Sequence, residues 1–133
     1  MTEPVWLTVE FVVAIHGEQL RLFGGPEGIR DLAMLESALD RPKNKWASGE
    51  RDLAALAAAY AFDIARNHPF VDGNKRAAFL SLITFLGLND IEFVAPEADA
   101  AAAILALAAS EIDEDGLTRW IRDNWPAGAP GKA

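Results

Sequence analysis

One stretch decides how this chain folds, and it reads His68-Pro69-Phe70-Val71-Asp72-Gly73-Asn74-Lys75-Arg76. It separates two apolar segments that are both typical of helices. A proline disfavours helical backbone angles in the residue before it, so we expect the incoming helix to end at His68. Asp72 or Asn74 can accept hydrogen bonds from the first turn of the outgoing helix, which predicts one of them as its N-cap. The sequence therefore predicts a tight loop between two packed helices.

The composition is that of a single soluble domain. The chain has 133 residues, of which 51 % are hydrophobic, enough for one core. Its net charge is −8 and its pI about 4.6, which argues against a broad basic face, so we expect no direct DNA binding. There is no cysteine, which excludes disulfides and suits a reducing cytoplasm. No apolar run reaches the ~20 residues that span a bilayer, and we expect a cytoplasmic protein without signal peptide or membrane contact.

The rest of the chain predicts an all-α domain over residues 1–126 and a flexible C-terminal tail over residues 127–133. We expect about six helices, at residues 9–23, 32–42, 53–67, 74–86, 96–110 and 114–125. Short strands are expected at most around residues 3–7, 43–50 and 91–94. The segment 74–86 is apolar nearly all round, which predicts a central helix covered on every side. Pro42 is expected to end the second helix, and Trp46 to anchor the following loop to the core.

The loop gathers residue types that suit phosphate chemistry. His68 can accept a proton near neutral pH, and Asp72 is the kind of hard ligand that Mg²⁺ takes beside phosphates. Gly73 allows successive N–H groups to face one anion. Lys75 and Arg76 stand at the positive end of the outgoing helix, where two cations oppose the helix dipole unless an anion lies among them. Each residue alone is more often structural, but their combination indicates a site for a polyphosphate.

These roles predict transfer of a phosphorus-containing group from a nucleotide to a hydroxyl. Two common nucleotide motifs are absent from the sequence, namely the GxxxxGK[ST] loop and the HRD and DFG motifs of protein kinases. The nucleotide would therefore be bound by the loop itself.

The nine residues resemble the signature of the Fic/Doc family, HxFx[DN][AG]NKR in its Doc branch. Flanking segments resemble Doc toxins as well, and with the loop they cover about residues 5–125: Gly28-Ile29-Arg30-Asp31, Leu35-Glu36-Ser37-Ala38-Leu39 with Arg41-Pro42, Phe85-Leu86 with Leu88-Asn89, and the region of Trp120. The resemblance implies a compact Fic/Doc-like helical bundle. It also implies the toxin of a type II toxin–antitoxin system, which transfers the γ-phosphate of ATP to a hydroxyl of elongation factor Tu and blocks translation.

The resemblance also implies a role for each residue of the loop. His68 would be the catalytic base and Asp72 the Mg²⁺ ligand, while Phe70 would plug the loop into the core. Gly73, Asn74, Lys75 and Arg76 would form the cradle for the phosphates of ATP. The implied partner is a Phd-like antitoxin whose C-terminal segment lies in a groove on the toxin and which makes the DNA contacts of the pair.

Two other functions stay open. Fic adenylyl transferases read HxFx[DE]GNGRxxR, and here Lys75 replaces the second Gly while Phe79 replaces the second Arg. Both differences favour the kinase, but Pro69 and Gly73 are shared with the adenylyl-transferring branch. The second alternative is a helical binding module without catalysis.

Three further features are expected to be structural. His16 is expected to be solvated at the surface of the first helix. Arg66 can favour the end of its helix or reach phosphate. The acidic residues Glu111, Asp113, Glu114 and Asp115 are expected to form a solvated loop and helix start, although Ser110 and Glu114 have part of the inhibitory pattern [ST]xxxE[GN] of some Fic proteins.

Overall fold

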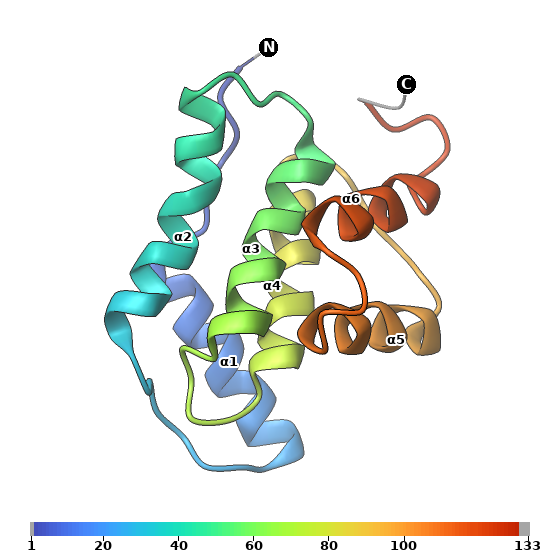
Figure 1. Cartoon of the computed structure of the whole chain (residues 1–133). Coiled ribbons are helices and arrows are strands. Elements are labelled where there is room, and N and C mark those ends of the chain that lie inside the picture. Colours follow the sequence, from blue (N-terminus) through green and yellow to red (C-terminus); the bar gives the residue numbers. More distant parts are fainter. Residues whose placement is uncertain (1, 131–133) are drawn as a thin grey trace.

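The structure, a computed structural model, describes residues 2–130, and in that part of the chain it contains six α-helices and no strand. The helices are α1 (Val9–Phe23), α2 (Leu32–Ala47), α3 (Leu53–Asn67), α4 (Asn74–Leu88), α5 (Glu97–Ala108) and α6 (Glu114–Asp123). Figure 1 shows α3 and α4 running antiparallel in the middle, with α1 and α2 on one side and α5 and α6 on the other. The prediction of an all-α bundle of about six helices is confirmed, and the possible short strands are not formed by the described residues.

The helix starts follow the local sequence closely. Four N-cap side chains accept a hydrogen bond from the first turn of their helix: Thr8, Asp31, Asp52 and Asp113. Each such bond satisfies an N–H group that has no partner within the helix. Local side-chain chemistry therefore accounts for the start of α1, α2, α3 and α6.

The most enclosed helix is α3 rather than α4. Alanine fills many positions of α3, so that α2, α4, α5 and α6 all pack against it. Its residues from Ala54 to Ala61 are all buried. The expectation that α4 is covered on every side is wrong, because Phe79, Leu80 and Ile83 are half-buried and Leu88 is 40 % exposed. The apolar residues on all sides of α4 therefore did not identify the most enclosed helix. The alanines of α3 did more, because their small side chains allow neighbouring helices to pack closely against several of its sides.

Helix α2 continues past Pro42 to Ala47, so the prediction that Pro42 ends it is wrong. A proline inside a helix costs about 3 kcal/mol, and contacts of the following turn offset that cost. The ring of Trp46 lies edge-on to Trp6, with centroids 6.3 Å apart, and packs against the core. Trp46 is thus an anchor, as expected, but within a helix rather than a loop.

Charged residues fasten α6 to α2 and α3. Glu114 is paired with Arg41 and, at 2.8 Å, with Lys45 Nζ. Arg41 Nη1 also lies 3.5 Å from Asp63 Oδ1, and burial raises the pKa of that carboxyl while Arg41 opposes the rise. Glu114 is therefore not part of a solvated helix start, as the sequence suggested, but ties α6 to α2, and Arg41 extends the pairing to Asp63 of α3.

The chain after α6 turns back on the core. Trp125 Nε1 donates a hydrogen bond to the carbonyl of Pro130 at 3.1 Å. Residues 131–133 of the predicted flexible tail lie outside the described residues, so its flexibility stays a prediction. No helix within residues 2–130 is long and apolar enough to cross a membrane.

Candidate functional site

The loop between α3 and α4 begins where α3 ends, at His68, as the sequence predicts. His68 has left-handed backbone angles, φ 50° and ψ 59°, which are uncommon in a residue other than glycine and are stabilised when tertiary contacts hold them. Arg30 supplies those contacts, because its Nε donates to the His68 carbonyl at 2.6 Å and its Nη2 to the Asn67 carbonyl at 2.7 Å. The side chain of His68 is exposed and free to meet a ligand.

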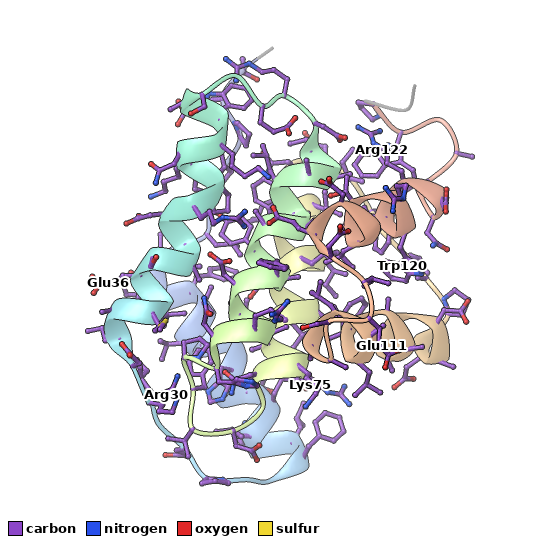
Figure 2. The ribbon with its side chains drawn as sticks, viewed as in Figure 1. Arg30, Glu36, Lys75, Glu111, Trp120 and Arg122 are labelled. Atoms are coloured by element: carbon purple, nitrogen blue, oxygen red, sulfur yellow. The ribbon has the colours of Figure 1, made fainter. Side chains whose placement is uncertain are left out.

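A second segment lies beside the loop and holds its backbone. The N–H groups of Arg30 and Asp31 donate to the Pro69 carbonyl at 2.7 and 3.0 Å, and Val71 N–H donates to the Gly28 carbonyl at 3.0 Å. Figure 2 shows Arg30 and Lys75 at the same end of the molecule, on opposite sides of the loop. The segment from Gly28 to Asp31 therefore acts as a brace, although it is far from the loop in sequence.

Phe70 and Asn74 close the loop from within. Phe70 is only 1 % exposed, so the expected plug into the core is confirmed. Asn74 Oδ1 accepts from the Phe70 N–H at 2.9 Å, and Asn74 Nδ2 donates to the Phe70 carbonyl at 3.0 Å. Neither Asp72 nor Asn74 is the N-cap of α4; Gly73 occupies that position, because the Asn74 amide is already committed to Phe70.

His16 belongs to the site, contrary to the expectation of a solvated side chain. It is 4 % exposed, and its Nε2 lies 2.7 Å from the carbonyl oxygen of Asp72. Its ring stacks on Phe70, with centroids 3.8 Å apart and planes 9° apart. The sequence did contain a signal for burial, since His16 stands four residues from both Val12 and Leu20, which are buried on the same face of α1.

The first turn of α4 is open to an anion. Its N-cap Gly73 has left-handed angles, φ 76° and ψ 19°, and no described side chain caps the turn. Lys75 and Arg76 are exposed beside it, and the Arg76 guanidinium lies 4.6 Å from the centre of the Phe23 ring. Uncapped N–H groups together with two cations favour a group of high negative charge at this position.

Asp72 provides an exposed carboxylate next to these N–H groups. A Cβ atom at Gly25 would come within 3.0 Å of Asp72 Oδ2, so the glycine leaves room for the carboxylate. No group of three or more His, Cys, Asp and Glu within residues 2–130 is placed to enclose a metal ion. One carboxylate beside a phosphate site is nevertheless a donor set that Mg²⁺ uses, because this ion keeps several waters and binds substrate phosphates. The residues present thus fit a magnesium ion that arrives with a nucleotide.

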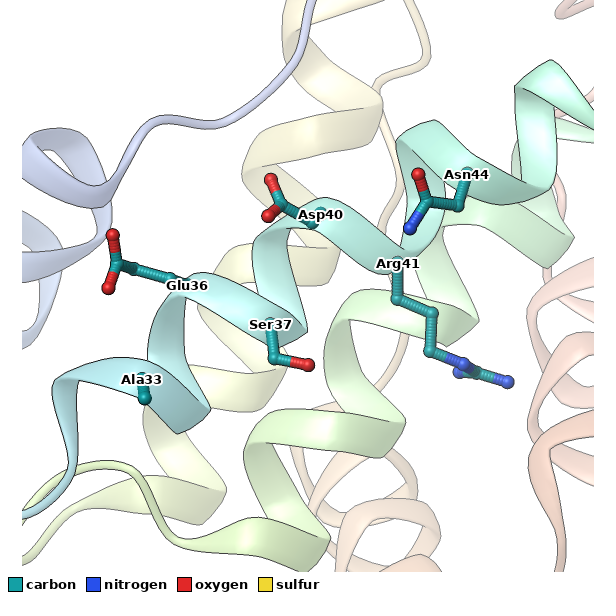
Figure 3. Close-up of a pocket in the computed structure, with 6 residues that line it drawn as sticks. All are labelled: Ala33, Glu36, Ser37, Asp40, Arg41 and Asn44. Atoms are coloured by element: carbon teal, nitrogen blue, oxygen red, sulfur yellow. The ribbon is translucent and has the colours of Figure 1, made fainter.

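Two surface hollows help to locate the site. One of about 410 Å³ begins at Lys75 and Arg76 and continues between α4 and α5, where its lining is apolar apart from Glu97: Phe79, Leu80, Ala100, Ala101, Ile104 and Leu105. Another of about 580 Å³ lies on the outer face of α2, lined by Ala33, Glu36, Ser37, Asp40, Arg41 and Asn44 (Figure 3). Of these two hollows, only the first adjoins the loop.

Arg66 is exposed, and its guanidinium lies 5.4 Å from the centre of the Phe62 ring. The sequence allowed it either to favour the end of α3 or to reach phosphate. The contact with Phe62 gives it a third, packing role.

Comparison with known proteins matches the part of the chain that builds this site. The family model described as "Fic/DOC family" matches residues 6–86. "Toxin Doc" of Mycolicibacterium smegmatis is 39 % identical over 75 residues, which are 55 % of this chain and 58 % of that protein. "Protein kinase doc" of Escherichia phage P1 is 33 % identical over 93 residues, 68 % of this chain and 74 % of that protein. Because the matched region includes the loop, its brace and α1, the chain belongs to the Fic/DOC family.

Proposed function

We propose that this protein is a Doc-type toxin of a type II toxin–antitoxin system, which transfers the γ-phosphate of ATP to a hydroxyl of elongation factor Tu. The observation that carries the proposal is the uncapped first turn of α4, with the exposed Asp72, Lys75 and Arg76 around it. The similarity to the protein kinase doc of phage P1 supports the assignment as a kinase. The protein would act in the cytoplasm, where it would stop translation.

In this proposal each residue of the loop has one task. His68 accepts the proton of the target hydroxyl, whose oxygen forms a bond to the γ-phosphorus while the bond from that phosphorus to the ADP oxygen breaks. The N–H groups of Gly73 and Asn74 and the cations of Lys75 and Arg76 bind the phosphate oxygens as negative charge moves to ADP. Asp72 would hold Mg²⁺, which neutralises phosphate charge when bound.

Adenylyl transfer is the second candidate, because Pro69 and Gly73 are shared with that branch. Lys75 favours the kinase, since its exposed side chain stands beside the cradle where adenylyl transferases have a glycine. The two reactions differ in which phosphate reaches the target. Purified protein, elongation factor Tu and Mg²⁺ are therefore incubated with ATP labelled at the γ- or at the α-position.

We expect label on the factor from γ-labelled ATP only, and none with His68→Ala. Label from the α-position would establish adenylyl transfer instead. Expression in a bacterial host distinguishes an enzyme from a protein that only binds its target: we expect growth arrest by the wild type and not by Asp72→Ala, which removes the carboxylate proposed to hold Mg²⁺. Equal arrest by both would indicate a binding module.

We further propose that the antitoxin, a Phd-like protein, inserts an apolar segment into the hollow between α4 and α5. The hollow has an apolar floor and begins at Lys75 and Arg76, so acidic residues of such a segment would compete with phosphate for the same cations. Leu105, which lines the hollow and is 55 % exposed, offers a test. We expect Leu105→Glu to weaken antitoxin binding while the transfer activity of the free toxin is retained.

A further inference from the structure

We propose that His16 is a positioning residue, which holds the peptide between Asp72 and Gly73 so that the Gly73 N–H faces the bound phosphates. The inference rests on the proposed function, because it assigns to a residue of α1 a task in nucleotide binding. It begins from a hydrogen bond that the packing of α1 alone does not require: His16 Nε2 lies 2.7 Å from the Asp72 carbonyl oxygen.

The direction of that bond fixes the direction of the next N–H group. The Asp72–Gly73 peptide is trans, and in a trans peptide the C=O and N–H groups point in opposite directions. Since the Asp72 carbonyl is turned toward the buried His16 side chain, the Gly73 N–H must point away from it. The outward side is the one where Asp72, Lys75 and Arg76 are exposed.

Gly73 itself cannot enforce this orientation. Glycine adopts positive and negative φ about equally well, so rotation of the 72–73 peptide meets little steric resistance at this residue. The neighbouring peptides are held by other groups, because Asn74 binds both backbone polar atoms of Phe70 and the Gly28 carbonyl binds Val71 N–H. The bond from His16 is thus the restraint that acts on the 72–73 peptide itself.

His16 is itself firmly placed. Its ring stacks on Phe70 at 3.8 Å, and Phe70 is 1 % exposed in the core. A Cβ atom at Gly73 would lie 3.4 Å from His16 Nε2, so the ring is close to this glycine as well as to the Asp72 carbonyl. The imidazole therefore connects a rigid helix to the one flexible residue of the anion site.

The test compares two substitutions of His16. Both remove the imidazole ring, but only one keeps a hydrogen-bond donor for the Asp72 carbonyl. His16→Gln keeps an amide N–H at similar reach, whereas His16→Met has similar size and no donor. ¹⁵N-labelled proteins are titrated with Mg²⁺ and an ATP analogue that cannot be hydrolysed between the β- and γ-phosphates. Thermal unfolding of each variant shows whether both are folded.

We expect the Gly73 amide resonance to shift on binding in the wild type and in His16→Gln. In His16→Met we expect a smaller shift and roughly tenfold weaker binding, because the Asp72 carbonyl loses its donor and the peptide is free to rotate. Equal behaviour of the two variants would overturn the inference, since a role in packing alone affects both alike.

A second measurement uses the wild type alone, so it does not depend on whether the variants fold. Nitrogen chemical shifts of the His16 ring show which nitrogen carries the proton in the neutral form, and the inference requires it on Nε2. A proton on Nδ1 alone would refute the inference whatever the variants show. If the wild type binds no nucleotide at all, the proposed function has failed, while the ring proton still decides whether His16 holds the peptide.

Discussion

The guanidinium group of Arg30 is hydrogen-bonded to the backbone of His68, with its Nε 2.6 Å from the His68 carbonyl oxygen. Its Nη2 donates to the preceding carbonyl, that of Asn67, at 2.7 Å. The last carbonyls of α3 lack partners within the helix, and the left-handed angles of His68 are costly unless something holds them. An arginine from a distant segment thus sets the direction in which the proposed base leaves the helix.

The first prediction is that Arg30→Met lowers phosphate transfer roughly tenfold to a hundredfold, because a small displacement of the base from its substrate costs that much. Arg30→Lys is expected to restore little, since an ammonium group does not reproduce the paired donors of a guanidinium. Initial rates with γ-labelled ATP measure the effect at saturating nucleotide.

Arg51 provides the matched control. Its Nη1 donates to the carbonyls of Trp46 and Glu50, so it satisfies the end of α2 much as Arg30 satisfies the end of α3. Arg51→Met should lose about 1 kcal/mol of stability and keep its transfer rate. Similar loss of transfer in Arg30→Met and Arg51→Met would mean that general destabilisation, and not the position of His68, explains the first result.

The second prediction concerns the room that Gly25 leaves for the Asp72 carboxylate. An added Cβ would come within 3.0 Å of Asp72 Oδ2, so Gly25→Ala should displace the proposed magnesium ligand. We expect the Mg²⁺ concentration for half-maximal transfer to rise about tenfold, as when a group that supports a metal ligand is altered.

Gly24→Ala is the control that separates the displacement of the Asp72 carboxylate from backbone strain in the loop. Gly24 and Gly25 both have positive φ, +80° and +122°, but a Cβ at Gly24 would meet nothing within 4 Å. Both substitutions should therefore destabilise the loop, and only Gly25→Ala should change the magnesium requirement. If both variants raised the Mg²⁺ requirement equally, displacement of the Asp72 carboxylate would not be the cause.

The sequence predicted what local chemistry determines. The caps Asp31 and Asp52 act on N–H groups two or three residues away, and Pro69 and Phe70 act within the loop itself, so these features could be read from short stretches. The residues proposed for catalysis were also found this way, because they all lie in one loop.

What could not be predicted depends on contacts between distant segments. Pro42 lies inside a helix because Trp46, one turn later, packs against Trp6. His16 and Arg30 reach the loop from 56 and 38 residues away in sequence, and no spacing or composition indicates such pairs. When His16 was considered alone, it was expected to be solvated. Its position on the same face of α1 as the buried Val12 and Leu20 indicated burial instead.

The third prediction tests the tie between α6 and the rest of the bundle. Glu114 is paired with both Arg41 and Lys45, and its side chain is 13 % exposed. Glu114→Gln should lower the free energy of unfolding by about 1–3 kcal/mol, because two cations lose their charged partner. Asp115→Asn removes a neighbouring exposed charge and should change it by less than about 0.5 kcal/mol. Denaturation by urea measures both, and equal effects would show that net charge rather than the tie is responsible.

The fourth prediction concerns Tyr60, whose buried hydroxyl oxygen accepts a hydrogen bond from Leu7 N–H at 3.1 Å. Burial raises the pKa of Tyr60 from its ordinary value of 10.0 to about 12, so the neutral phenol stabilises the folded state at lower pH. Above about pH 10 the unfolded chain ionises first, and the stability due to this group is lost as pH rises toward 12. Relative to Tyr60→Phe, the wild type should lose roughly 1.4 kcal/mol per pH unit across this interval.

Tyr60 is the only tyrosine in the chain, so the ultraviolet absorbance of tyrosinate reports this one group. In the folded protein the absorbance should rise with a midpoint near pH 12, and in urea near pH 10. Near neutral pH, Tyr60→Phe should itself be about 1–3 kcal/mol less stable, because Leu7 N–H loses its acceptor inside the core. Parallel pH curves for the wild type and Tyr60→Phe, or the same midpoint with and without urea, would contradict the burial of an un-ionised phenol at this position.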